Sequence, residues 1–411
     1  MVMNVLWVSH FLLFPESGFG ALQRSRNLLI ELSKRHRVTL LSYYRDVDLQ
    51  ATTDVDVARL DLERVCDHVE LIYLPFSQSQ KVKTGIQSVL FGRPHSVALY
   101  RTAHLMQRAK ELVRTRSIDV LHVDTLGLMD DVVEKLPVRL KTLTHHNVES
   151  HMMGRRAEKE PDPFKRWVYA HETNKLRRYE HRICPRYDLN VMVSELDEIS
   201  LRRHTPGVQS AVIPNGVDCR YFSFVERTLE SKSLIFAGGL DWYPNADAVR
   251  FMCLEIWPAL RQRFPNLTLD IIGRNASHDL TRLTQTTPGV RLHGYVPDVR
   301  PYVRRANIFV CPIRDGGGTR LKILDAMAQG IPIVATTMAC EGLGMKHGEQ
   351  VLYADTAQEY VMMIDRLLSD QALCSHLSRT ARRFVEEHYS FTKVGEKLSE
   401  TYQQALWAKK G

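Results

Sequence analysis

The chain has 411 residues, more than a single hydrophobic core normally serves, so two domains are expected. Apolar residues make up 44% of the chain and charged residues 25%, which excludes a mostly disordered protein. The net charge of +8 either suits an anionic partner, such as a phosphorylated donor, a lipid pyrophosphate or a membrane surface, or only confers solubility.

The first half of the chain contains short apolar runs separated by longer amphipathic stretches. This alternation predicts a parallel sheet with helices on both faces. The predicted strands are 4–9, 38–43, 69–74, 120–123, 140–144, 189–194 and 211–214. The first run is followed by Pro15-Glu16 and has no basic leader, so we interpret it as a strand and loop, not as a signal peptide or membrane span.

A second series of the same kind follows, at 234–237, 267–273, 290–293, 308–312, 333–336 and 351–353. The fold class is therefore α/β, with two consecutive doubly wound, Rossmann-like domains. The turn sequence at 214–218 and the polar stretch after it place a first domain at 1–225 and a second at 226–390. The amphipathic end, 391–411, is predicted to be a helix that packs back near the first domain.

The seven cysteines are scattered, and no two of them form a CxxC pair. This distribution favours a reducing cytoplasm and argues against a structural metal site. We also find no nucleic-acid-binding motif in the sequence.

The segment 151–186 has an unusual composition, with ten Lys or Arg residues against five Asp or Glu residues and with Trp167, Tyr169 and Tyr179 among them. A solvated helix pair that caps the first domain is the preferred interpretation. The alternative is a basic, aromatic surface that rests on anionic lipid headgroups.

In open parallel sheets, ligands bind beyond the carboxyl ends of the strands. The most informative such loop follows the strand at 308–312 and contains Gly316, Gly317, Gly318, Thr319, Arg320 and Lys322. Glycines let the backbone approach a ligand, and a helix that starts near Gly318 offers unpaired N–H groups to an anion. Two cations in the first turn oppose the helix dipole unless something negative is bound, so the loop predicts a pyrophosphate site.

Two loops of the first domain carry further candidates. Gly18 and Gly20 stand at the start of the predicted helix 22–34, where backbone N–H groups are suited to approach a donor phosphate. The strand at 140–144 is followed by His145, His146, Asn147 and Glu149. A polar cluster at a strand end favours a functional role for this segment. In the second domain, Arg274 is an additional candidate cation, with a solvated loop arginine as the alternative.

Several of these segments together resemble the retaining glycosyltransferases of the GT-B fold, glycosyltransferase family 4. The resemblance is carried by 213–218 (IPNGVD), 236–240 (FAGGL), 293–298 (HGYVPD) and the glycine loop through 336. It implies two domains that face each other across a cleft, a nucleotide-sugar donor bound mainly by the second and an acceptor bound mainly by the first. It also implies retention of anomeric configuration, no cofactor and no metal.

The resemblance assigns roles to particular residues. The base is expected near Gly294 and Tyr295, and the ribose hydroxyls at Asp325, since a carboxylate accepts two hydroxyl hydrogen bonds. By the same resemblance, His146 orients the donor sugar, with His145 as the second choice. Asn147 and Glu149 are candidates for the acceptor.

The chain departs from the family pattern in two places. The first of the two usual glutamates is Gly317 here, while the second is Asp325. The arginine and lysine that usually follow the first strand of the second domain are replaced by a sequence that begins Gly238-Gly239. We infer that the missing charge has moved to Arg320 and Lys322, which form the diphosphate clamp.

These observations predict a hexosyltransferase that moves a sugar from a UDP- or GDP-sugar to a glycan or lipid-linked acceptor in bacterial polysaccharide assembly. The expected location is cytoplasmic, either free or peripheral on the inner face of the membrane. Two alternatives remain, an inactive nucleotide-sugar-binding scaffold and a nucleotide-sugar epimerase of related fold.

Overall fold

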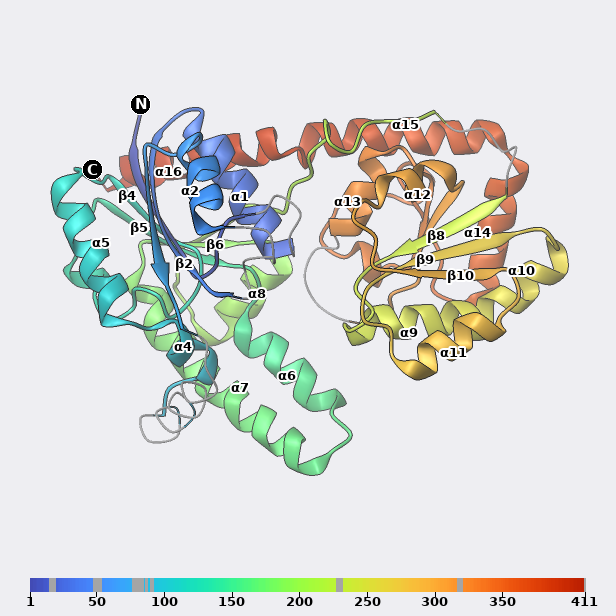
Figure 1. The fold of residues 1–411 in the computed structure, drawn as a ribbon, viewed down its shortest axis with the longest axis horizontal. Coiled ribbons are helices and arrows are strands. Elements are labelled where there is room, and N and C mark those ends of the chain that lie inside the picture. The colour runs from blue at the N-terminus through green and yellow to red at the C-terminus, as the bar shows by residue number, and fades with distance from the viewer. Residues whose placement is uncertain are drawn as a thin grey trace. The chain divides into compact units, whose positions relative to one another are not determined.

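The computed structural model describes residues 1–14, 20–46, 54–75, 85, 88, 92–226, 232–315 and 321–409 (Figure 1). The chain divides into two compact units. The first comprises Met1–Pro214 together with Val394–Gly411, and the second comprises Asn215–Lys393. The division after Pro214 comes earlier than the predicted position, 225/226.

The first unit is built on a parallel seven-stranded sheet with the order β3-β2-β1-β4-β5-β6-β7. Its elements are β1 (Asn4–Ser9), α1 (Gly20–Ser33), β2 (Arg37–Tyr44), α2 (Val55–Glu63), β3 (His68–Tyr73), α4 (His95–Tyr100), α5 (Ala103–Thr115), β4 (Val120–Val123), β5 (Leu140–His145), α6 (Glu149–Lys159), α7 (Pro163–Ile183), β6 (Leu189–Met192), α8 (Glu195–His204), β7 (Ser210–Val212) and most of α16 (Phe391–Ala408).

Strand β1 shows why this sheet is covered on both faces. Side chains alternate along a strand, so Leu6 and Val8 enter one buried cluster while Val5 and Trp7 enter the other. The second cluster also contains Tyr402 of α16, which makes the C-terminal helix part of the core of this unit.

The second unit is built on a parallel six-stranded sheet with the order β10-β9-β8-β11-β12-β13. Its elements are β8 (Ser233–Ala237), α9 (Tyr243–Phe251), α10 (Trp257–Arg263), β9 (Thr268–Ile272), α11 (His278–Thr286), β10 (Val290–Gly294), α12 (Arg300–Arg305), β11 (Ile308–Cys311), α13 (Leu321–Ala328), β12 (Ile333–Ala335), β13 (Leu352–Tyr353), α14 (Ala357–Ser369) and α15 (Gln371–His388).

The predicted α/β fold class is confirmed, and each predicted strand is present with ends that differ by at most two residues. One of these shifts matters for the site. Strand β5 includes His145, which the sequence analysis placed beyond the strand end.

In each sheet the strand order reverses once, between β1 and β4 in the first unit and between β8 and β11 in the second. Such a reversal leaves a crevice beyond the carboxyl ends of the two strands, where ligands of open α/β sheets bind. Residues after β1 and β4, and after β8 and β11, are therefore the expected ligand contacts. Within the described parts of the chain, no helix combines the length and apolar character needed to cross a membrane.

Candidate functional site

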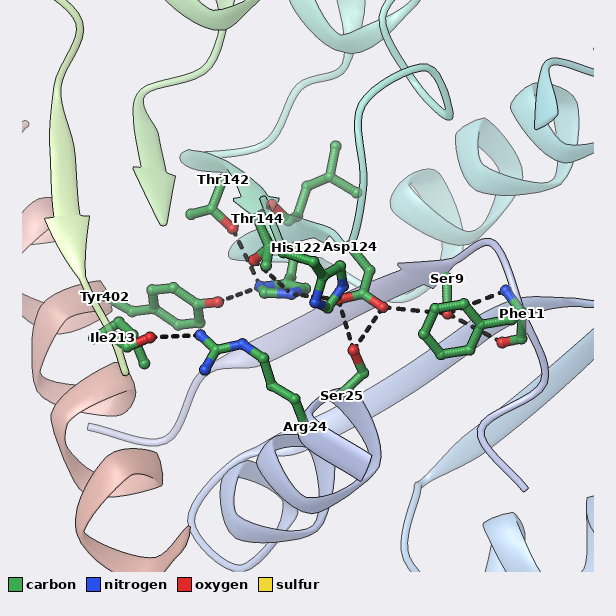
Figure 2. A network of polar contacts seen from close by, with 12 residues as sticks. Ser9, Phe11, Arg24, Ser25, His122, Asp124, Thr142, Thr144, Ile213 and Tyr402 are labelled. Carbon is green, nitrogen blue, oxygen red and sulfur yellow. Dashed lines mark hydrogen bonds and ion pairs between the residues drawn. The ribbon is translucent and has the colours of Figure 1, made fainter. Parts of the chain in front are cut away.

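Asp124, directly after β4, is the centre of the polar network at the reversal point of the first sheet (Figure 2). Its carboxylate is fully buried and accepts hydrogen bonds from Ser25 Oγ at 2.8 Å and from Ser9 Oγ at 3.3 Å. Ser9 ends β1 and Ser25 lies on α1, so these two elements converge on the carboxylate that follows β4.

Two histidines lie beside the same carboxylate. Nε2 of His146 is 3.3 Å from Asp124 Oδ1, and Nε2 of His122 is 3.8 Å from it. Burial alone would raise the pKa of Asp124, but the neighbouring His146 and His122 outweigh it and hold this pKa well below its usual range. The result is a buried carboxylate that stays ionised and faces a partly exposed imidazole.

The network continues from His122 to the C-terminal helix. His122 stacks on Trp7 with ring centroids 3.6 Å apart, and its Nδ1 is hydrogen-bonded to the buried hydroxyl of Tyr402 on α16. Its Nε2 lies 3.2 Å from Thr144 Oγ1. Because His122 is enclosed on every side, it supports Asp124 and is not accessible to a substrate.

Arg24 on α1 is the cation of this region and has a structural function. Its guanidinium donates to the carbonyl oxygens of Ile213, at 2.6 Å, and Pro214, at 2.5 Å, and it is fully buried. Burial lowers its pKa to about 10, which still leaves it charged at neutral pH. Arg24 thus fixes Ile213 and Pro214, at the end of the segment Met1–Pro214, to α1.

His10, one residue beyond β1, lies near His146, with 6.4 Å between ring centroids. Its Nδ1 is buried and has no hydrogen-bond partner among the residues that the structure describes, and burial lowers the pKa of His10 to about 3. His10 is therefore a buried, neutral imidazole at the reversal point of the first sheet. The sequence analysis missed His10 and Asp124, although the strand-end rule applied to β1 and β4 would have selected both.

The other first-domain candidates fall into different environments. His145, the last residue of β5, is buried with Nε2 2.9 Å from Asn190 Oδ1, so it is a structural residue and does not serve as an alternative to His146. Glu149 is the first residue of α6, and burial, followed by the charge of Glu180, raises its pKa to about 7. Asn147 precedes α6 and is partly buried, and Gly20 is the first residue of α1. Gly18 lies outside the described residues.

In the second unit, Lys322 extends from α13 to the loop that follows β8. Its Nζ donates to Asn245 Oδ1 at 2.7 Å and lies 4.6 Å from the ring centroid of Phe236. A Cβ added to Gly238 would be only 2.2 Å from this Nζ. The Lys322 ammonium therefore occupies the space that a side chain at position 238 would need.

Asp325 lies one helical turn beyond Lys322 on α13. Burial raises the pKa of its carboxyl to about 7. Within the part of the chain that the structure describes, this carboxylate has no hydrogen-bond or ion-pair partner, and the residue keeps part of its surface accessible to solvent. A poorly solvated acceptor without a protein donor is suited to bind ligand hydroxyl groups.

The remaining donor-side candidates surround the same strand ends. Gly294 closes β10 with a φ of 68°, and the Tyr295 side chain is 69% exposed. Arg274 is largely exposed, with Nε 3.9 Å from Asp241 Oδ2. Gly316, Gly317, Gly318, Thr319 and Arg320 lie outside the described residues.

Sequence reasoning also missed a polar pair after β8 and β11. The Tyr243 hydroxyl, at the start of α9, is hydrogen-bonded to the buried Asp315, four residues beyond β11. The pair joins the two loops at the reversal point of the second sheet. Asp315 directly precedes the glycine run, a position that could have marked it.

Comparison with known proteins agrees with this architecture. Residues 231–370 match the family model described as glycosyl transferases group 1. The chain is 22% identical over 391 residues to an uncharacterized 44.6 kDa protein in the cps region of Klebsiella pneumoniae, covering 93% of this chain and 95% of that protein. It is 25% identical over 240 residues to a phosphatidyl-myo-inositol mannosyltransferase of Mycolicibacterium smegmatis, covering 56% of this chain and 59% of that enzyme.

Among solved structures, HepE from Anabaena in complex with UDP and glucose is similar along almost the whole length. The TM-score is 0.65 at 14% identity, with 98% of this chain and all of that chain covered. This likeness shows the fold. The two parallel sheets and the structural neighbours show the GT-B fold, and residues 231–370 of the second unit match the group 1 glycosyltransferase family.

Proposed function

We propose that this glycosyltransferase moves a hexose from a UDP- or GDP-sugar to a hydroxyl of a glycan or lipid-linked acceptor, with retention of anomeric configuration and without a metal. The pathway we propose is bacterial polysaccharide assembly, carried out in the cytoplasm or at the inner face of the membrane. The observation that carries the proposal is the placement of Lys322 against Gly238, within a group 1 glycosyltransferase domain.

The second unit supplies the chemistry of a donor site. The Lys322 ammonium at the end of β8 offers charge to a diphosphate, where the family usually has cations in the β8 loop itself. Asp325 offers acceptors to ribose hydroxyls, and Tyr295 and Gly294 border the place expected for the base. Together with Arg320, Lys322 would stabilise the negative charge that develops on the departing diphosphate.

The first unit supplies a fixed imidazole for the transferred sugar. Nε2 of His146 faces Asp124, so Nδ1 is the nitrogen left to contact a substrate hydroxyl. In retention without a protein nucleophile, the acceptor oxygen attacks the anomeric carbon from the side on which the diphosphate leaves. The bond between the anomeric carbon and the diphosphate oxygen breaks, and the departing phosphate oxygen takes the proton of the acceptor hydroxyl. Asn147 and Glu149 would then hold the acceptor.

The donor is tested first by thermal unfolding with a panel of UDP-, GDP- and ADP-sugars, because a ligand that binds the native state raises its melting temperature. We expect stabilisation by a UDP- or GDP-sugar without added metal, and loss of this effect in Lys322→Ala. A panel that leaves the melting temperature unchanged would contradict the proposal.

Transfer is tested by incubating the stabilising donor with glycan and lipid-linked acceptors and determining the anomeric configuration of the product by NMR. An inverted product would overturn the retaining mechanism. Donor stabilisation without transfer to any acceptor would instead favour a binding scaffold, and turnover of the donor alone an epimerase.

A further inference from the structure

Apart from Glu149 at the start of α6, the helical hairpin formed by α6 and α7 has no role in the site described above. It begins immediately after His146 and Asn147 and extends away from the sheet of the first unit (Figure 1). The part of α7 near the sheet is anchored by buried Leu176, Tyr179 and Ile183. Every residue from Pro161 to Val168, at the tip, is exposed.

The tip exposes large apolar side chains. Phe164 is 71% exposed and Trp167 is 64% exposed, and Val168 beside them is also exposed. The Trp167 ring stacks between Phe164, at 6.3 Å, and His171, at 5.7 Å, so these rings form one row along α7. Solvent contact of two neighbouring aromatic rings is unfavourable, and such a patch marks an interaction surface.

The same face of α7 becomes cationic toward the sheet. Lys175, Arg178 and Arg182 follow His171 at helical spacing, and they line a hollow of about 790 Å³ together with Trp167. The acid among the lining residues is Glu172, which accepts from the backbone N–H of His95 and lies 3.7 Å from Lys175 Nζ. The face therefore combines aromatic rings and an excess of positive charge.

The aromatic rings and the positive charge on this face together indicate which kind of partner it binds. A second copy of the same face would bring like charges together, and a soluble anion would leave Phe164 and Trp167 in water. The surface of an anionic bilayer satisfies both requirements, because aromatic rings lie at headgroup depth and Lys or Arg side chains bind the lipid phosphates. Lys165 and Arg166 next to Trp167 add cations at the tip itself.

We propose that this face of α7 docks the protein on an anionic lipid bilayer, with Phe164 and Trp167 at the depth of the headgroups. The inference rests on the proposed function, because docking on a bilayer serves an enzyme whose acceptor is linked to a lipid. It assigns the contact with the bilayer to one face of α7, in the hairpin that follows His146.

The experiment measures sedimentation of the whole protein with vesicles of phosphatidylcholine alone and of phosphatidylcholine mixed with phosphatidylglycerol. We expect binding to the mixed vesicles that weakens as salt is added. The double variant Phe164→Ser/Trp167→Ser should bind at least about tenfold more weakly, from the loss of two apolar anchors. Arg178→Glu/Arg182→Glu should also weaken binding and flatten its dependence on salt.

Two matched controls locate the effect. Trp407→Ser removes a side chain that is 78% exposed on α16, and Lys346→Glu reverses an exposed charge in the second unit. Both should bind like the parent protein. Docking by α7 is overturned if the parent protein ignores the mixed vesicles, binds both kinds equally, or loses no affinity in the aromatic double variant.

The outcome is separable from that of the proposed function. Thermal stabilisation by the nucleotide-sugar is measured on every variant without vesicles, and it also confirms that each variant folds. A parent protein that binds vesicles but no donor refutes the proposed function alone. Variants that keep donor stabilisation while binding vesicles like the parent refute the docking surface alone.

Discussion

The reversal points of the two sheets carry opposite kinds of site. In the first unit, Asp124 is held by Ser9 and Ser25 and by two histidines, so its charge is fully used by the protein. In the second unit, the Asp325 carboxylate has no hydrogen-bond or ion-pair partner within the described residues. In the first unit the polar groups are already paired by the protein, whereas in the second unit a hydrogen-bond acceptor is left for a ligand to pair with.

The difference follows from what each site must do. A group that orients a reacting sugar needs a fixed position, which buried hydrogen bonds supply. A site that captures a nucleotide needs charges and acceptors that the protein leaves unsatisfied, at some cost in stability. The comparison therefore separates the expected effects of mutation, with turnover affected in the first unit and donor affinity in the second.

The largest effect is expected for Asp124→Asn. It keeps the shape of the side chain but removes the charge beside His146, so kcat should fall by about 100-fold. Steady-state kinetics measures this, and the melting temperature checks folding. Asp365→Asn, which removes a partly exposed partner of Arg263, is the control and should leave kcat unchanged. A normal kcat in Asp124→Asn would remove the fixed imidazole from the mechanism.

The next effect concerns Lys322→Ala, which removes the ammonium that lies beside Gly238. Donor binding should weaken by roughly 1.5 to 3 kcal/mol, the value of a charge-assisted hydrogen bond, and Arg320→Ala should act in the same direction. Titration calorimetry measures the change, and Lys346→Ala serves as a control on an exposed lysine. Unchanged affinity in Lys322→Ala would show that the clamp lies elsewhere.

Adding one methyl group at position 238 also tests the contact between Lys322 and Gly238. Gly238→Ala places a Cβ that would be 2.2 Å from Lys322 Nζ, so the ammonium must move. We expect weaker donor binding, by about tenfold, with Lys322 still present. Equal affinities in Gly238→Ala and the parent protein would mean that the position of this ammonium does not matter.

The Asp325 carboxyl gives a prediction in pH. Burial raises its pKa from 3.8 to about 7. Between these two pH values the folded state keeps a proton that the unfolded chain has released. The free energy of unfolding therefore falls as pH rises through this range. Asp325→Asn should therefore raise the melting temperature above about pH 7 but not near pH 4.

Donor binding should depend on pH in the opposite sense. Hydroxyl groups donate to the ionised carboxylate, so affinity should increase as pH rises through about 7 in the parent protein and stay flat in Asp325→Asn. Calorimetry at several pH values measures both. Parallel pH curves for the two proteins would exclude Asp325 from the donor site.

The smallest effect is expected at the far end of the first network. Tyr402→Phe removes the hydrogen bond to His122 and should cost about 1 kcal/mol of unfolding free energy, with kcat reduced only a few-fold. Tyr389→Phe removes a buried tyrosine hydroxyl in the second unit and should cost the same stability without affecting kcat. Chemical denaturation and kinetics compare the two variants.

The fold was predictable because its cause is local. Buried strands such as Ile308–Cys311 are continuous apolar runs, and their order along the chain is visible in the sequence. What could not be predicted is which distant side chains meet. The pairing of Asp124 with Ser25, and of His122 with Tyr402, depends on how helices α1 and α16 pack, over separations of 99 and 280 residues.

The candidate site was predictable in part for the same reason. Lys322 and Asp325 could be proposed from their motif, but the approach of the Lys322 ammonium to Gly238 required the structure. His145 and His146 look equivalent in the sequence. The end of β5 separates them, because alternate residues of a strand point to opposite faces and His145 faces Asn190.

The separation of roles is tested most directly by titrating one nucleotide-sugar into Lys322→Ala and Asp124→Asn side by side, with kcat measured on both. We predict that Lys322→Ala loses donor affinity, while Asp124→Asn binds the donor like the parent protein and loses turnover. Loss of donor affinity in Asp124→Asn, together with full affinity in Lys322→Ala, would contradict the account.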